Sequence, residues 1–202
     1  MKFFIASKNA HKITEFKRIL LPLNIDVVSE ADLDEPLEEV EETGQTFEEN
    51  AYLKAVSAMK VTGLPVIADD SGLCVDYLNG QPGIYSARFA GEPTDNNKNN
   101  EKLLFLLKDV PENKRTAKFV CCIVCVFPNG EKITVQGECK GRIAEHPAGD
   151  KGFGYDPIFI SEIGCFGELS DEEKDSVSHR GIALKAFSEK IKNIINNGEN
   201  NA

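Results

Sequence analysis

Asn129-Gly130 lies between two extended apolar segments, residues 117–127 and 132–143. An Asn-Gly pair in this setting is a strong short-range signal for a β-hairpin, because both residues accept the positive φ angles of a tight turn. The sequence therefore predicts a long hairpin, and so a sheet with at least one antiparallel pair of strands.

The rest of the chain alternates between strand and helix patterns. Short apolar segments are expected to form strands at residues 2–6, 25–28, 64–68 and 158–160. Helices are expected after an Asn9 cap, after a Thr46–Glu49 capping box, and over residues 94–107 and 178–195. This alternation predicts an α/β protein with a mixed sheet, in one domain over residues 1–196. Residues 197–202 are expected to form a disordered tail.

The charge and hydropathy of the chain limit its partners. The 202 residues carry a formal net charge of −10, which argues against a broad basic face for a nucleic-acid polymer but not against one bound nucleotide. No segment is long and apolar enough to span a membrane, and the apolar run at residues 3–6 is too short for the core of a signal peptide. The expected location is the cytoplasm.

Half of the six cysteines lie in the first strand of the expected hairpin. Alternation places Cys121 and Cys125 on one face of that strand and Cys122 on the other. Zinc ligands usually converge from turns as two separated pairs. We therefore interpret these cysteines as small buried hydrophobic residues of a protein in a reducing compartment.

Four segments carry side chains suited to nucleotide chemistry, and the first is residues 7–12, between a strand and a helix. A helix N-terminus presents free N–H groups and the positive end of its dipole, which suits a phosphate. Lys8 and Lys12 add cationic donors, and Ser7 and Asn9 can donate hydrogen bonds. The segment lacks the glycine spacing of a P-loop, and the alternative interpretation is a capped surface helix with exposed lysines.

The second segment is Asp69-Asp70-Ser71-Gly72, which we expect to follow the end of the strand at residues 64–68. Loops after strand ends are where α/β folds build ligand sites. Paired carboxylates can hold Mg²⁺, and one of them can orient or deprotonate a water molecule. The alternative is an ordinary Asp-Ser-Gly turn. From the acidic stretch at residues 30–42, Glu42 is the carboxylate that we expect to reach this site.

The third and fourth segments combine glycine, aromatic and cationic residues. In residues 152–157 two glycines allow a close backbone approach, Phe153 can stack on a base, and Asp156 can accept from a sugar or base N–H. The alternative is a tight loop whose aromatic residues pack inward. Residues 172–181 bring Lys174 and the pair His179-Arg180 to a helix start, as a clamp for a base or a phosphate.

Together these segments resemble the inosine/xanthosine triphosphate pyrophosphatase family, and the resemblance covers almost the whole chain. The matching stretches, in order, are Ser7-x-Asn9-x-x-Lys12, Glu42-Thr43-Gly44, Thr46-Phe47-x-Glu49-Asn50-Ala51, Ala68 to Gly72, Pro82 to Arg88, Gly152 to Pro157 and Ser178 to Gly181. Each is weak to moderate alone, whereas all of them in sequence are a strong signal.

The resemblance implies a fold and an activity. The fold would be an elongated central mixed β-sheet with flanking helices, with two lobes around an active-site cleft, in a homodimer. The activity would be Mg²⁺-dependent hydrolysis of non-canonical purine nucleoside triphosphates, namely ITP, dITP and XTP, to the monophosphate and pyrophosphate.

The resemblance also implies roles for individual residues. The phosphates would be held by Ser7, Asn9 and Lys12, assisted by Lys54 and Lys174. Glu42 and Asp70 would bind Mg²⁺, and Asp70 would activate the attacking water with Asp69 in support. The substrate would be contacted by Ser71, and its base and sugar would be held by Phe153, Gly154, Tyr155 and Asp156. The 6-oxo edge of the purine would be read by His179 and Arg180.

Three other functions match parts of the pattern. A related pyrophosphatase would prefer another base, although the segments at residues 153–156 and 179–180 match a purine 6-oxo group. A phosphatase with a phospho-aspartate intermediate usually carries Asp-x-Asp, whereas the acids here are adjacent. A module that only binds nucleotides has no need of Glu42 and Asp69-Asp70 for water activation, and turnover with and without Mg²⁺ distinguishes it from an enzyme.

Overall fold

The computed structural model describes residues 2–33 and 35–199. Its sheet has the strand order β2-β1-β3-β4-β5-β6-β7. The strands are β1 (Lys2–Ile5), β2 (Asp26–Ser29), β3 (Val66–Val75), β4 (Thr116–Val126), β5 (Lys132–Ile143), β6 (Phe159–Ser161) and β7 (Gly164–Cys165). β1 pairs in parallel with β2 and β3, whereas β6 pairs antiparallel with β5 and β7. The sheet is therefore mixed, which confirms the predicted α/β class.

The helices are α1 (Ala10–Leu20), α2 (Phe47–Thr62), α3 (Asn96–Leu106), α4 (Asp171–Val177) and α5 (His179–Glu199). The chain divides into two compact units. Unit 1 comprises the described residues of Met1–Asp70, Cys121–Gly137 and Gly181–Ala202, and unit 2 comprises Ser71–Val120 and Glu138–Arg180. The predicted cleft between two lobes stays a prediction.

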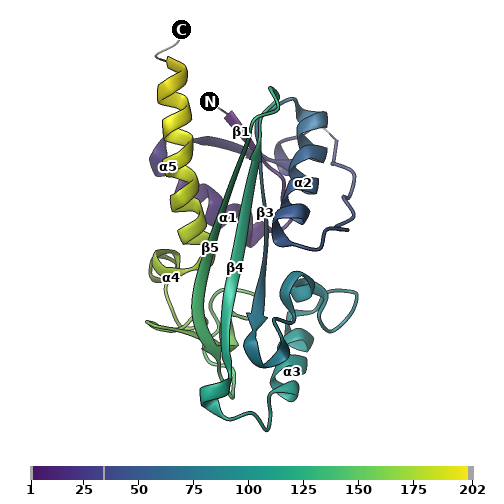
Figure 1. Cartoon of the computed structure of the whole chain (residues 1–202), viewed down its shortest axis with the longest axis vertical. Helices are drawn as coiled ribbons and strands as arrows, with labels where there is room; N and C mark the ends of the chain where they lie inside the picture. Colours follow the sequence, from purple (N-terminus) through teal and green to yellow (C-terminus); the bar gives the residue numbers. More distant parts are fainter. Residues whose placement is uncertain (1, 34, 200–202) are drawn as a thin grey trace. The chain divides into compact units, whose positions relative to one another are not determined.

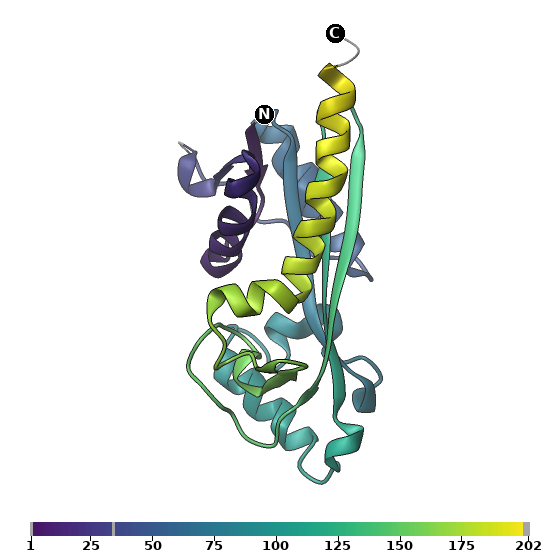
Figure 2. The same cartoon turned by 90° about the vertical axis from the view of Figure 1, so that its left-hand side faces the viewer.

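In unit 1 helices cover both faces of the strands. Alternate residues of β1 separate, so that Phe3 packs with Phe16 of α1 and Phe187 of α5, while Phe4 packs with the alanines of α2. Figures 1 and 2 show α5 and α2 on opposite sides of these strands. The cysteines of β4 follow the same alternation, as predicted: Cys121 and Cys125 lie in the first cluster and Cys122 in the second.

Unit 2 has its own core, built around an aromatic group. The Phe119 ring lies 4.7 Å from Phe159 and 6.0 Å from Phe166, measured between ring centroids. Beside this core, the buried guanidinium of Arg115 donates to the carbonyl oxygens of Leu107, Ile143 and Ala144 at 2.6–2.9 Å. A buried cation is tolerated here because its N–H groups are satisfied by backbone acceptors.

Several predicted local features are present. Asn9 caps α1 by accepting from the backbone N–H groups of His11 and Lys12, and Thr46 and Glu49 form the capping box of α2. The hairpin of β4 and β5 is also present, and Gly130 has a φ of 88° in its connection. Asn129 does not have a positive φ, so the connection at residues 127–131 is longer than a two-residue turn.

Three features differ from the sequence-based expectation. The strand expected to end at Ala68 continues as β3 to Val75, and α4 was not predicted as a helix. Asp is depleted in strands, but contacts with other elements stabilise both aspartates of β3. Residues 197–199 belong to α5, past its predicted end, and the rest of the predicted tail, residues 200–202, lies outside the described residues. Among the described residues, no helix has the length and apolar character needed to cross a bilayer.

The buried thiol of Cys125 predicts a loss of stability in alkali. Burial raises its pKa from 9.0 to about 12, so the folded chain holds this proton where the unfolded chain releases it. Its contribution is therefore complete below pH 9 and is lost as the pH rises towards 12. Between pH 8 and pH 10, the wild type should lose about 1 kcal/mol more unfolding free energy than Cys125→Val, measured by urea denaturation. Equal losses in the two proteins would contradict this prediction.

Candidate active site

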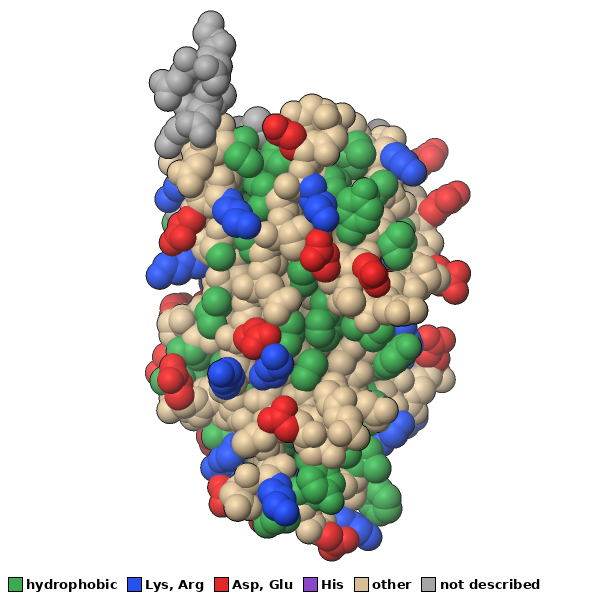
Figure 3. Space-filling view, viewed as in Figure 1, with side chains coloured by type: hydrophobic (Ala, Val, Ile, Leu, Met, Phe, Trp, Pro, Cys, Tyr) green, Lys and Arg blue, Asp and Glu red, His purple; other side chains and the backbone are tan. Residues whose placement is uncertain are grey.

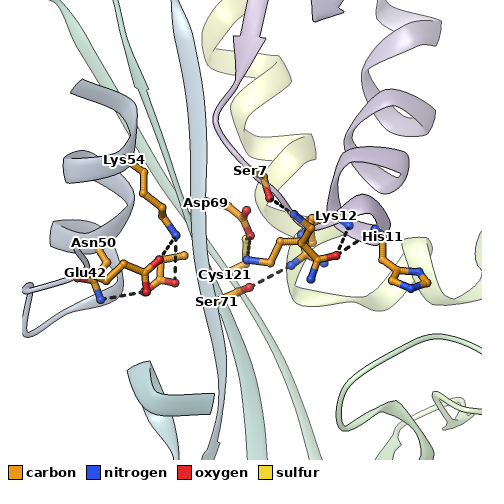
Figure 4. Close-up of polar contacts among 12 residues, drawn as sticks. Ser7, His11, Lys12, Glu42, Asn50, Lys54, Asp69, Ser71 and Cys121 are labelled. Atoms are coloured by element: carbon orange, nitrogen blue, oxygen red, sulfur yellow. Dashed lines mark hydrogen bonds and ion pairs between the residues drawn. The ribbon is translucent and has the colours of Figure 1, made fainter. Parts of the chain in front are cut away.

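Asp69 and Asp70 are neighbours in β3, so their side chains point to opposite faces of the sheet. Asp69 faces α1, where its Oδ2 lies 3.0 Å from Nζ of Lys12. Asp70 faces α2, where its Oδ2 accepts from Nδ2 of Asn50 at 3.2 Å. Figure 4 shows Lys12 and Lys54 on the two sides of the strand. The two carboxylates thus have different partners on opposite faces of β3 and do not form one shared binding site.

On the α2 face, one lysine joins two carboxylates. Nζ of Lys54 lies 2.8 Å from Oε1 of Glu42 and 3.5 Å from Oδ1 of Asp70. Burial lowers the pKa of Lys54, but Asp70, Asp69 and Glu42 outweigh burial and raise it. For Asp70 burial dominates and raises the pKa of the carboxyl, against the opposing charges of Lys54 and Lys12. A further positive charge near Asp70 would therefore stabilise the ionised form of its carboxylate.

The donors of this face fit a divalent cation. Glu42 and Asp70 are hard oxygen ligands, and they already share one cation, the ammonium of Lys54. The described residues contain no group of three or more His, Cys, Asp or Glu side chains placed to hold a metal. Mg²⁺ does not need one, because it is commonly bound through one or two carboxylates together with substrate phosphates.

On the α1 face, the predicted phosphate segment is partly occupied by its own cap. Oδ1 of Asn9 accepts from the backbone N–H groups of His11 and Lys12 at 3.0 and 3.2 Å, and Oγ of Ser7 accepts from the N–H of Asn9 at 3.3 Å. The side chain of Lys8 is exposed. A phosphate at this end would gain the lysine charges but would compete with Asn9 for two N–H groups.

In unit 2 the predicted base-binding loop is held by a buried ion pair. Nζ of Lys174 lies 2.8 Å from Oδ2 of Asp156, and the two side chains are 6% and 4% exposed. The same oxygen accepts from the N–H of Phe153 at 2.7 Å. Gly152 has a φ of 73°, and a Cβ there would lie 2.2 Å from Oδ2 of Asp156. Asp156 therefore ties the loop to α4, and its predicted contact with a sugar or base stays a prediction.

The remaining predicted residues of unit 2 lie around the same loop. The guanidinium carbon of Arg180 lies 5.9 Å from the centroid of the Phe153 ring, and its Nη2 donates to Oγ of Ser71 at 3.0 Å. The ring of His179 stacks on Phe119 at 4.6 Å and 11°. The hydroxyl of Tyr155 is buried and donates to the carbonyl of Ser86 at 2.8 Å, so Tyr155 anchors the loop inward.

Comparisons with known proteins identify the family of this chain. The model of the Ham1 family matches residues 3–190. This chain belongs to the Ham1 family. It is similar to a dITP/XTP pyrophosphatase of Bacillus cereus: the two chains are 50% identical over 191 residues, which cover 93% of each chain. The Ham1 protein of Staphylococcus aureus has a solved structure with a TM-score of 0.84 and 43% identity, covering 96% of this chain and 99% of that one. The Ham1 protein of Coxiella burnetii gives a TM-score of 0.86 at 37% identity, covering 96% and 99%.

Two buried asparagines of this Ham1 chain were not predicted as site residues. Asn50 contacts Asp70 and the N–H of Gly44, and Asn100 of α3 donates to the carbonyl of Gly154 at 3.0 Å. Asn50 lies in the matching stretch Thr46 to Ala51, four residues before Lys54. This spacing places the two side chains on one helix face, and it could have indicated that Asn50 belongs to the site. Nothing in the local sequence around Asn100 indicates a partner so distant in the chain.

Proposed function

We propose that this protein is a Mg²⁺-dependent pyrophosphohydrolase that converts ITP, dITP and XTP to the nucleoside monophosphate and pyrophosphate. The observation that carries the chemistry is the buried carboxylate of Asp70, which shares the ammonium of Lys54 with Glu42. The substrate class is supported by the dITP/XTP pyrophosphatases that are about 50% identical over nearly the whole chain.

In the proposed reaction, carboxylates and lysines around β3 carry out the phosphate chemistry. Mg²⁺ held by Glu42 and Asp70 would supply charge neutralisation when bound. An oxygen of Asp70 accepts a proton from the water that attacks the α-phosphorus, and the bond to the β-phosphate breaks so that pyrophosphate leaves. Lys12 and Lys54 stabilise the negative charge that develops on the phosphate oxygens.

Base recognition in this proposal is assigned to Phe153, His179 and Arg180. Phe153 stacks on the purine, while Arg180 and His179 donate to the O6 acceptor of hypoxanthine or xanthine. Adenine presents an amino group at this position, which leaves a buried donor unpaired and costs about 1–3 kcal/mol. The ion pair of Lys174 and Asp156 fixes the loop that carries Phe153.

The charge distribution supports a small-molecule substrate over a nucleic-acid polymer. On the face in Figure 3, Lys and Arg side chains are interspersed with Asp and Glu, and the net charge is −10. A polymer-binding face would concentrate cations. We also propose that the enzyme works in the cytoplasm as a homodimer, which light scattering of the purified protein at several concentrations tests directly.

The product identifies the bond that is cut. Purified protein incubated with dITP should release pyrophosphate and dIMP in equal amounts, and chelating Mg²⁺ with EDTA should abolish turnover until excess Mg²⁺ is restored. Release of orthophosphate and dIDP would instead assign the chain to a different hydrolase reaction. Binding of dITP without any turnover would assign it to a nucleotide-binding module.

A further inference from the structure

Asn50 occupies a costly position in α2. Its side chain is 0% exposed, it lies within the helix, and asparagine is about 0.5–0.7 kcal/mol less favourable there than alanine. A buried amide that lacks partners would add a further cost. Both ends of this amide have a hydrogen-bond partner, however: the oxygen contacts Gly44, two residues after Glu42, and the nitrogen contacts Asp70.

One end of the Asn50 amide holds the loop that follows Glu42. Oδ1 of Asn50 accepts from the N–H of Gly44 at 2.8 Å, and Oε2 of Glu49 accepts from the N–H groups of Gln45 and Thr46. Side chains from the first turns of α2 therefore bind three consecutive backbone N–H groups. A Cβ on Gly44 would lie 2.6 Å from Oδ1 of Asn50, so only glycine permits this approach.

The other end of the amide holds Asp70. Nδ2 of Asn50 donates to Oδ2 of Asp70 at 3.2 Å, while Lys54, one helical turn later, lies 3.5 Å from Oδ1. Each carboxylate oxygen of Asp70 therefore has its own partner on α2, which fixes the rotation of the carboxylate. Lys54 also contacts Glu42 at 2.8 Å, which closes the connection back to the loop (Figure 4).

We infer that Asn50 is a positioning residue that holds Glu42 and Asp70 at fixed positions relative to each other, as binding of one divalent cation requires. One amide fixes both the loop that carries Glu42 and the rotation of Asp70, so the two carboxylates are placed before the cation binds. This inference rests on the proposed function. Residues that orient metal ligands in this way typically change metal affinity or activity by about 10–100-fold when they are replaced.

The test compares Asn50→Leu with Asn99→Leu. Asn99 is a matched control, because it is 2% exposed and its amide accepts from the N–H of Ala90 and donates to the carbonyl of Ala87, with no carboxylate among those partners. For Asn50→Leu we expect kcat to fall about 10–100-fold with KM within about threefold, and the Mg²⁺ concentration for half-maximal rate to rise about tenfold. For Asn99→Leu both values should stay within about threefold, although the melting temperature falls in both variants.

A second variant changes Gly44, whose N–H donates to Oδ1 of Asn50. Gly44→Ala keeps the side chains of Asn50, Glu42 and Asp70, but the new Cβ would lie 2.6 Å from Oδ1 of Asn50 and 2.7 Å from Cβ of Glu49. The loop and the first turn of α2 must therefore separate, which should raise the half-saturating Mg²⁺ concentration in the same way. Amide hydrogen exchange, followed by NMR without Mg²⁺ or nucleotide, should be at least about tenfold faster at residue 44 in Asn50→Leu than in wild type, and unchanged there in Asn99→Leu.

The outcomes separate this inference from the proposed function. Equal losses of kcat in Asn50→Leu and Asn99→Leu, or a kcat within about threefold of wild type in Asn50→Leu, would overturn the role of Asn50. Slow exchange at Gly44 in Asn50→Leu would overturn it as well. A wild type that releases no pyrophosphate would overturn the proposed function, while the exchange at Gly44 would still test the link between Asn50 and the loop.

Discussion

Asp70→Asn is expected to lower kcat for dITP by at least about 10²-fold while changing KM by only a few fold. The replacement keeps the size of the side chain but removes the charge that Lys54 contacts at 3.5 Å and the oxygen that would accept a proton from water. Substrate binding should persist, because the lysines and the residues proposed to hold the base are unchanged. Steady-state pyrophosphate release measures both constants.

The control for this prediction is Asp69→Asn in the same strand. Asp69 faces α1 and pairs with Lys12 at 3.0 Å, so its replacement should affect phosphate binding through Lys12 and reduce kcat less than Asp70→Asn. An Asp70→Asn enzyme with activity within a few fold of wild type would contradict the role of Asp70. A greater loss of kcat in Asp69→Asn than in Asp70→Asn would assign the proton-accepting role to the opposite face.

Lys174→Met is expected to lower the free energy of unfolding by about 3–5 kcal/mol, because it leaves the buried carboxylate of Asp156 without its charged partner. The N–H of Phe153 still donates to this carboxylate, but it does not neutralise the charge. Urea denaturation of the purified variant measures the loss. The loop at residues 152–156 should also lose order, so KM for dITP should rise.

Lys118→Met provides the comparison for this ion pair. Lys118 and Glu138 are also 2.8 Å apart, but their side chains are 39% and 33% exposed. Solvent-exposed pairs usually contribute about 0–1 kcal/mol, so Lys118→Met should cost less than about 1 kcal/mol. Similar losses in the two variants would show that burial of Asp156 does not determine the effect.

Local sequence signals predicted much of the fold. The Asn129-Gly130 turn, the Asn9 cap and the Thr46–Glu49 capping box depend on residues within a few positions of one another, and all three are present. The alternation of Cys121 and Cys122 between faces follows from strand geometry alone. Such features need no knowledge of distant contacts.

The misplaced features depend on contacts that are distant in sequence. The strand was predicted to end at Ala68, where the apolar run gives way to Asp69-Asp70-Ser71-Gly72, but Lys12 and Asn50 stabilise Asp69 and Asp70 within β3. Continuation of the strand also determines that the two carboxylates face opposite sides. The inward bond of Tyr155 to Ser86 likewise joins segments 69 positions apart, so periodicity alone does not reveal it.

The most direct test of the proposed function is pyrophosphate release with Mg²⁺ from ITP, dITP, XTP, ATP, GTP, CTP and UTP, measured side by side. We predict a kcat/KM for ITP, dITP and XTP about 10–10²-fold above that for ATP, CTP and UTP, with pyrophosphate as the product. Equal turnover of all seven nucleotides, or turnover of none, would contradict the proposed function.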